Sequence, residues 1–248
     1  MKALFALSLL LLTACSHSIS LRATHFAAPV VAENQWGGHA AVVAASQTRV
    51  TVIDDIATNP PTRTKVRIND DADVGDMFGA NNIGFDASLS VYKGIEIYMD
   101  NFLWGARYQF LNHGSQTGVW VGAIQGAFGT KSESTDEFSI NHSTSQADAK
   151  SSITTSQAGI SLGYKLQHVV PYFSYIYEAH KIETDVKNTH GTFGPYTNEG
   201  VHGYYSLGLS TYQRGFRIAA EYSYIDIKWK DSEQTGQGAF GIKAGFAW

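Results

Sequence analysis

Apolar and polar residues alternate along most of this chain from residue 83 onward. Between Ile83 and Val91, and again between Phe102 and Phe110, every second residue is apolar and those between are mostly small or polar. A period of two is that of a β-strand whose two faces meet different surroundings. The alternation predicts about ten strands, at residues 36–52, 83–91, 95–99, 102–110, 118–129, 152–166, 170–186, 201–213, 216–229 and 238–248.

Short and long connections alternate between these segments, which supports an antiparallel meander. The segments 54–82, 130–151 and 188–200 read as long polar loops on one side, and 230–237 is intermediate. The apolar parity switches between Ile97 and Phe102, so we interpret Asp100-Asn101 as a turn; a bulge in a single strand is the alternative. Eight or twelve strands stay possible because the first region is less regular than the others.

The last predicted strand has one apolar face and one face of small or charged residues. Phe240, Ile242, Ala244, Phe246 and Trp248 share the apolar parity. This ending resembles the closing strand of bacterial outer-membrane β-barrel proteins, whose signature is a terminal aromatic residue on an alternating strand. The resemblance implies an all-β, transmembrane, up-and-down antiparallel barrel in the outer membrane of a Gram-negative bacterium. It also implies that the barrel-assembly machinery recognises the strand ending in Trp248.

The amino end predicts export. A short positive start is followed by an apolar run from Ala3 to Leu12, which has the length of a signal peptide rather than of a spanning helix. The sequence Leu12-Thr13-Ala14-Cys15 resembles the lipobox of bacterial lipoproteins, which implies lipidation of Cys15. The alternative is ordinary cleavage near Ala32. We therefore expect a signal peptide at 1–14, a lipidated periplasmic tether at 15–35 and a barrel at 36–248.

Composition agrees with a barrel and excludes several other classes. The 248 residues include 24 Gly, 13 Tyr, 13 Phe and 5 Trp, which suits a barrel with aromatic girdles. The single cysteine excludes an intramolecular disulfide and a cysteine-based metal cluster. The formal net charge is −4, and no basic cluster predicts nucleic-acid binding. We expect no cofactor and no metal.

The polar parity of the strands would face the lumen if the apolar parity faces lipid. Because isolated charges are costly in a narrow interior, we expect basic and acidic side chains to pair there and close the lumen. A narrow polar conduit for small solutes is the alternative. The expected charge network consists of Asp86, Arg107, Glu178, His180, Arg217, Glu221 and Lys243, with Arg107, Arg217 and Lys243 paired to Asp86, Glu178 and Glu221.

Catalysis has weak support in this sequence. Omptin proteases, which are ten-stranded, place Asp and His two residues apart, whereas Asp185 and His190 are five apart and of opposite parity. Glu178 and His180 have the right separation but fit the charge network better. Asn141-His142-Ser143 does not match the His-x-Ser of lipid A deacylases, since His142 and Ser143 are adjacent. We therefore expect no enzyme, with a hydrolase at the rim as the less favoured alternative.

A soluble lipocalin-like barrel is the rival fold, because it too is an up-and-down barrel, with an apolar interior and a polar exterior. The sequence cannot say which face is inside. With the membrane reading, the outer segments 54–82, 130–151 and 188–200 are the expected contact surface for an unknown extracellular ligand. The expected function is structural or surface interaction in the outer membrane, in contact with its lipid, and the alternative is a narrow solute channel.

Overall fold

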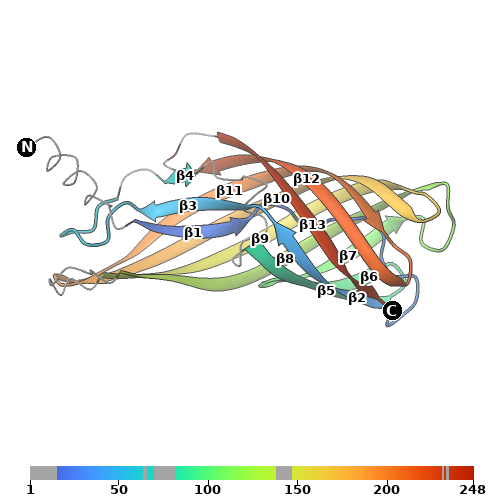
Figure 1. Ribbon diagram of the computed structural model, residues 1–248, viewed down its shortest axis with the longest axis horizontal. Helices are drawn as coiled ribbons and strands as arrows, with labels where there is room; N and C mark the ends of the chain where they lie inside the picture. Colours follow the sequence, from blue (N-terminus) through green and yellow to red (C-terminus); the bar gives the residue numbers. More distant parts are fainter. Residues whose placement is uncertain (1–15, 64–65, 70–81, 138–146, 231, 233–234) are drawn as a thin grey trace, which may run out of the picture.

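Ten antiparallel strands close into a barrel in the computed structural model of the protein, which describes residues 16–63, 66–69, 82–137, 147–230, 232 and 235–248 (Figure 1). The ring runs in the order β10-β11-β12-β13-β2-β5-β6-β7-β8-β9. Its strands are β2 (Gly38–Ala45), β5 (Ile83–Tyr92), β6 (Ile95–Asp100), β7 (Leu103–Leu111), β8 (Val119–Glu137), β9 (Ala147–Lys165), β10 (Val169–Asn188), β11 (Gly191–Thr211), β12 (Gly215–Trp229) and β13 (Thr235–Ala247). The predicted fold class and the predicted number of barrel strands are confirmed.

The last strand closes the ring, as its pattern predicted. β13 pairs with β12 on one side and with β2 on the other, so that no edge of the barrel stays unpaired. The backbone N–H of Trp248 donates to the carbonyl oxygen of Gly38 at 3.1 Å, and the N–H of Gly38 donates to the carbonyl oxygen of Trp248 at 3.3 Å. A sheet in lipid needs such closure because unpaired backbone groups find no water there.

Tight turns join the strands at the end where Trp248 lies. Lys93-Gly94 connects β5 to β6, and Gly94 has φ +76°, a backbone conformation that glycine adopts without strain. At the opposite end, Asn101 has φ 54° in the connection between β6 and β7. The interpretation of Asp100-Asn101 as a turn between two strands is therefore confirmed, and the alternative of a bulge within one strand is wrong.

Two of the three predicted outer loops are hairpins instead. β8 and β9 stay paired as far as Glu137 and Ala147, and β10 and β11 are joined by only two residues, Thr189 and His190. In Figure 1 these long strands extend past the rest of the wall, at the end opposite the carboxyl terminus. The predicted loops at 130–151 and 188–200 are thus largely wrong, because the backbone continues its ladder beyond the apolar segment of each strand.

A second, three-stranded sheet consists of β1 (His17–Arg22), β3 (Gln47–Ile53) and β4 (Arg67–Asn69), in the order β1-β3-β4. The region predicted as one strand, 36–52, is split: β2 ends at Ala45 within the wall, and β3 leaves the wall to pair with β1. β1, β3 and β4 make antiparallel pairs, and the alternate residues Ile19 and Leu21 of β1 are buried. We call this three-stranded unit the inner sheet.

Candidate functional site: a plugged lumen

The outside of the barrel carries a continuous belt of exposed aromatic and aliphatic side chains. On β12 the belt runs from Phe216 to Tyr224, about the length that a tilted strand needs to cross a bilayer, and Asp226 and Lys228 follow at once. Members on the other strands of the wall are Phe85, Trp104, Tyr108, Phe110, Trp120, Ile124, Phe128, Ile160, Leu162, Phe173, Tyr177, Tyr205, Leu207, Leu209 and Phe246. A water-soluble barrel would not expose such a surface, so the lipocalin-like alternative is wrong.

The amino-terminal segment passes through the lumen. The backbone N–H groups of His25 and Phe26 donate to Glu221 Oε1 on β12 at 2.9 and 3.1 Å, and the N–H of Val31 donates to Gln109 Oε1 on β7 at 3.0 Å. We call residues 17–31 the plug segment. Side chains from β6, β7, β8, β9, β10, β11 and β12 contact it, which places it inside the ring.

The amino end of this segment lies among the long hairpins. His17 Nδ1 and Nε2 lie 2.8 Å from Thr135 Oγ1 and Ser151 Oγ, on β8 and β9. The segment then runs toward the end of the barrel that holds Trp248, where β2 begins (Figure 1). The predicted periplasmic tether at 15–35 is therefore wrong for residues 17–31, because Ile19, Leu21 and Phe26 need a buried environment and find it in the lumen. Cys15 and the predicted signal peptide lie outside the described residues.

An apolar core seals the half of the lumen nearest the hairpins. The inner sheet and the plug segment contribute Ile19, Leu21, Val50 and other residues that are almost completely buried. The wall contributes inward-facing Ile153, Ile176, Ile182, Val186, Ile225, Ile227 and Trp229. Packed hydrocarbon excludes water and ions, so this half of the lumen contains a core rather than a pore.

Charged side chains fill the half nearest Trp248. Lys243 Nζ on β13 lies 3.0 Å from Asp86 Oδ1 on β5, one of the three carboxylates expected as partners, and the same oxygen contacts His39 Nε2 on β2. These three residues connect the strands on both sides of the point where the ring closes. Their side chains are only 10 to 15% exposed. We call Asp86, His39 and Lys243 the seam cluster.

The two predicted arginines have other partners than those expected. Arg107 Nη1 on β7 donates to Glu96 Oε1 on β6 at 3.2 Å, and its Nε donates to Gln125 Oε1. Arg217 donates to the backbone carbonyl oxygens of Tyr212 and Gln213. The expected pairs of Arg107 and Arg217 with Glu178 or Glu221 are therefore wrong.

Glu178 and Glu221 hold the plug segment instead of a wall cation. Glu178 Oε1 lies 3.5 Å from His25 Nε2 and accepts a hydrogen bond from Gln157 Nε2. Its second oxygen lies 3.4 Å from His180 Nε2 and accepts from the hydroxyl of Tyr204. Arg22 of the plug segment forms an ion pair with Asp100 at the end of β6. Every predicted member of the charge network thus faces the lumen, but the members form several small groups.

Sequence reasoning missed the residues of the plug segment, although a signal for them was present. His17-Ser18-Ile19-Ser20-Leu21-Arg22 alternates with a period of two, as the wall strands do. It also missed Glu96 as the partner of Arg107. These two residues are direct neighbours across β6 and β7, and the turn at Asn101 sets that register.

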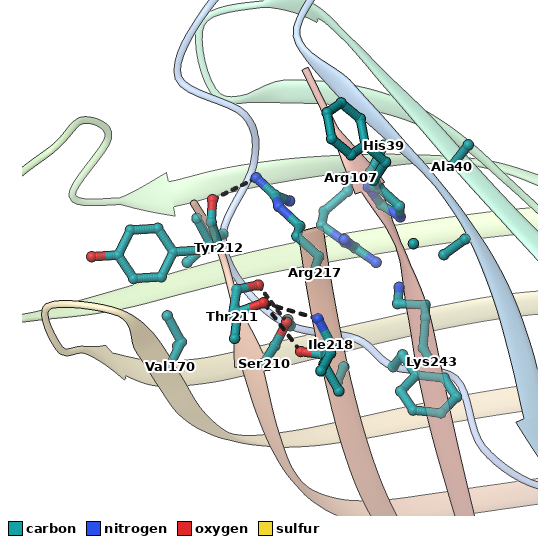
Figure 2. Close-up of a pocket in the computed structure, with 17 residues that line it drawn as sticks. His39, Ala40, Arg107, Val170, Ser210, Thr211, Tyr212, Arg217, Ile218 and Lys243 are labelled. Atoms are coloured by element: carbon teal, nitrogen blue, oxygen red, sulfur yellow. Dashed lines mark hydrogen bonds between the residues drawn. The ribbon is translucent and has the colours of Figure 1, made fainter. Parts of the chain in front are cut away.

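This half of the lumen contains two cavities lined by described residues. The smaller has a volume of about 30 Å³, room for very few water molecules, and Figure 2 shows Arg107, Arg217 and Lys243 directed toward it. The larger, of about 490 Å³, lies at the barrel end formed by Trp248 and the short turns, and it shares Arg217 and Tyr212 with the smaller one. The larger of these two cavities therefore lies at the carboxyl-terminal end of the lumen, and the apolar core lies beyond it.

The residues considered for hydrolysis do not form a catalytic group. Asp185 points outward from β10 and His190 lies in the exposed two-residue turn. Glu178 and His180 are in contact, but their side chains are only 3 and 2% exposed inside the plugged lumen. In the part of the chain that the structure describes, no group of three or more His, Cys, Asp or Glu side chains has the geometry to hold a metal ion.

The fold and the surface define a class of protein: a membrane-spanning β-barrel with a plugged lumen, which agrees with the predicted location in the Gram-negative outer membrane. No helix among the described residues is long and apolar enough to cross a membrane.

Comparisons with known proteins found solved structures of similar fold but no matching family. No family model and no curated protein matches the chain. One similar structure is the crystal structure of Ail, the attachment invasion locus protein of Yersinia pestis, in complex with the heparin analogue sucrose octasulfate. Its sequence is 16% identical to this chain, and the two structures superpose with a TM-score of 0.40. The match covers 86% of this chain and all of that one. The outer membrane channel DcaP of Acinetobacter baumannii is 9% identical with a TM-score of 0.22, covering 87% of this chain and 96% of that one. At these values the resemblance carries no argument about function.

Proposed function

We propose that the protein is a non-enzymatic outer-membrane barrel that acts through the surface it presents at the outer end. The observation that carries this proposal is the combination of a sealed lumen and long hairpins. On β8 the last large outward-facing apolar residue of the belt is Phe128, yet the strand continues to Glu137. On β10 it is Tyr177, and the strand continues to Asn188.

The hairpins suit contact with another molecule because their outward faces are polar and their backbone is fixed. Thr130, Ser132 and Ser134 alternate on the outward face of β8, and Lys181 pairs with Glu183 at 2.7 Å on β10. The connection between β3 and β4 supports the same end, since Asn188 Nδ2 donates to the carbonyl oxygens of Ile56 and Thr58 at 3.0 and 2.9 Å. A rigid, hydrogen-bonded platform loses little conformational entropy when a partner binds.

Lipidation of Cys15 forms part of the proposal, but the expected location of its acyl chain differs from the inner leaflet that a periplasmic tether implies. Since His17 is held between the hairpins, an acyl chain on Cys15 would lie at the outer end of the barrel and not at the inner leaflet of the membrane. The partners are outer-membrane lipid, the assembly machinery that reads the strand ending in Trp248, and an extracellular ligand that the barrel meets at its hairpins.

The test shortens the hairpins without changing the wall. Thr135 pairs with Ala149 and Val186 with Phe193, so an Asn-Gly turn can replace residues 136–148 or residues 187–192 in register. We expect both variants to stay in the outer membrane with the heat-dependent gel mobility of the parent, and at least one to fail to complement a strain that lacks the protein. Complementation by both would contradict a role for the hairpins.

The alternative of a narrow solute channel has support only from the hollow at the carboxyl-terminal end. Planar-bilayer recordings separate the two functions, because a surface-interaction protein with a sealed lumen should show no steady conductance at neutral pH. A large, steady conductance of the unmodified protein would favour the channel. Turnover of a peptide or of lipid A by the purified barrel would favour a hydrolase.

A further inference from the structure

Three imidazoles gather around one carboxylate inside the barrel. His25 belongs to the plug segment, His180 to β10 and His202 to β11. Two of their Nε2 atoms lie 3.5 and 3.4 Å from the oxygens of Glu178, and the rings of His180 and His202 have centroids 4.6 Å apart. All three side chains are almost completely buried. We call these four residues the histidine cluster.

Among the described residues, each imidazole of the histidine cluster has a hydrogen-bond partner at one ring nitrogen only. Each Nδ1 atom has a partner: Gln157 Nε2 for His25, Thr155 Oγ1 for His180 and the Tyr204 hydroxyl for His202. The Nε2 atoms of His25, His180 and His202 are buried without a hydrogen bond in the described structure. Each of the three neutral rings can bind one more proton, and one nitrogen of each ring lies without a hydrogen bond in the same desolvated space.

The charges around the cluster can balance one added proton but not three. Glu178 is the only carboxylate in contact with the imidazoles among the described residues, and it also accepts hydrogen bonds from Gln157 and Tyr204. Arg22 and Asp100 neutralise each other. Glu221 on β12 contacts the backbone of His25 and not its ring, and it is also bound by the hydroxyl of Tyr172. A second and a third imidazolium would be buried without a counter-charge.

We propose that the histidine cluster is a proton-binding site that controls whether residues 23–31 stay docked in the lumen. These residues lie outside every strand, so side-chain contacts and hydrogen bonds to wall side chains hold most of them. At neutral pH, where an ordinary imidazole is mostly uncharged, the segment is docked. At acidic pH His25 on the segment is repelled by His180 and His202 on the wall, while water that enters the undocked state solvates all three.

The sign of the effect follows from proton linkage. The undocked state binds more protons than the docked state, because its imidazoles are hydrated, so docking weakens as the pH falls. The population of the undocked state rises by about tenfold per pH unit for each additional proton that it binds. The strands of the wall carry their own ladder of backbone hydrogen bonds, so the barrel itself stays closed.

Hydrogen exchange with mass spectrometry tests the proposal on the full-length protein in detergent. After correction for the intrinsic pH dependence, we expect the amides of residues 23–31 to exchange at least about tenfold faster at about pH 5 than at about pH 7.5. Peptides covering 216–224 of the wall should keep their protection. Equal corrected rates at both pH values for residues 23–31 would overturn the proposal, as would an equal loss of protection in the wall.

Variants test whether the acid-dependent exchange of residues 23–31 originates in the histidine cluster. The double variant His180→Gln/His202→Gln should lose most of the acid response, because only one titrating ring remains beside Glu178. The matched control is His168→Gln in the exposed turn between β9 and β10, which should respond like the parent. His25→Gln gives a second measurement if the double variant does not fold. A full acid response in either cluster variant, or its loss in His168→Gln, would contradict the assignment.

Discussion

The seam cluster offers a quantitative test of how the barrel is held closed. Asp86 on β5 contacts both His39 on β2 and Lys243 on β13, so its carboxylate connects three strands at the point where the ring closes. The substitution Asp86→Asn keeps the shape of the side chain but removes its charge. The ammonium group of Lys243, which is only 15% exposed as a side chain, is then left without its counter-charge.

The expected loss of stability is about 3 kcal/mol, the lower end of the range for breaking a buried ion pair by removing one partner, because both groups keep slight access to water. The measurement is the free energy of unfolding from urea titration in detergent, followed by the fraction of folded barrel on an unheated gel. Replacing both partners, as Asp86→Asn/Lys243→Met, removes the unpaired charge and should recover about 2 kcal/mol of that loss.

An exposed ion pair serves as the matched control. Lys181 and Glu183 are paired at 2.7 Å, but both side chains are about half exposed. Glu183→Gln should therefore change the free energy of unfolding by less than about 1 kcal/mol. The reasoning fails if Asp86→Asn costs no more than this control. It also fails if the double variant is as unstable as the sum of the two single substitutions, since that would show no coupling across the seam.

Three further results are expected. Phe26→Ala, which truncates a plug side chain that is 2% exposed, should cost about 3 kcal/mol by opening a cavity, and a change below about 1 kcal/mol would show that the plug segment is loosely packed. Deleting residues 17–31, which include β1, should give a barrel that conducts in planar bilayers, whereas silence would mean that β3 and β4 close the lumen without β1. An epitope inserted between Ser16 and His17 should bind antibody on intact cells, and binding only after the outer membrane is permeabilised would reverse the orientation assigned to the amino end.

The wall of the barrel could be predicted because lipid imposes a signal on it. Each strand that crosses the bilayer must show an apolar residue at every second position, so the pattern from Phe216 to Tyr224 marks both a strand and its outward face. The turn at Asn101 could be predicted for the same reason, since the parity of the apolar residues changes there.

The hairpins could not be predicted because that signal ends where the bilayer ends. Between Thr130 and Glu137 the outward residues of β8 face water rather than lipid, and the segment is rich in Ser, Thr and acidic residues. A strand that is polar on its exposed face has the composition of a loop, and its hydrogen bonds to β9 leave no trace in the sequence. Composition therefore favoured loops where the backbone forms a ladder.

The contacts between side chains inside the lumen also divide into those that the sequence can predict and those that it cannot. Glu96 and Arg107 are cross-strand neighbours on β6 and β7, so the length of one turn suffices to predict their contact. Asp86 and Lys243 are 157 positions apart, and they meet only because β13 closes onto β2. The need to balance charge in a narrow interior predicted that Lys243 pairs with one of three carboxylates, but not that its partner is Asp86. The contacts of His25 with the wall required knowing that the plug segment is inside.

The topology also constrains the order in which the barrel can form. The plug segment precedes β2, and β2 is the strand onto which β13 closes. Threading the segment through a finished ring would bring Arg22 and His17 past a packed apolar interior, which is costly for charged and polar groups. If β13 pairs with β2 last, the wall can close around the segment without any threading. Substitutions that weaken docking, such as Phe26→Ala, should then slow closure as well as lower stability, whereas Glu183→Gln should affect neither.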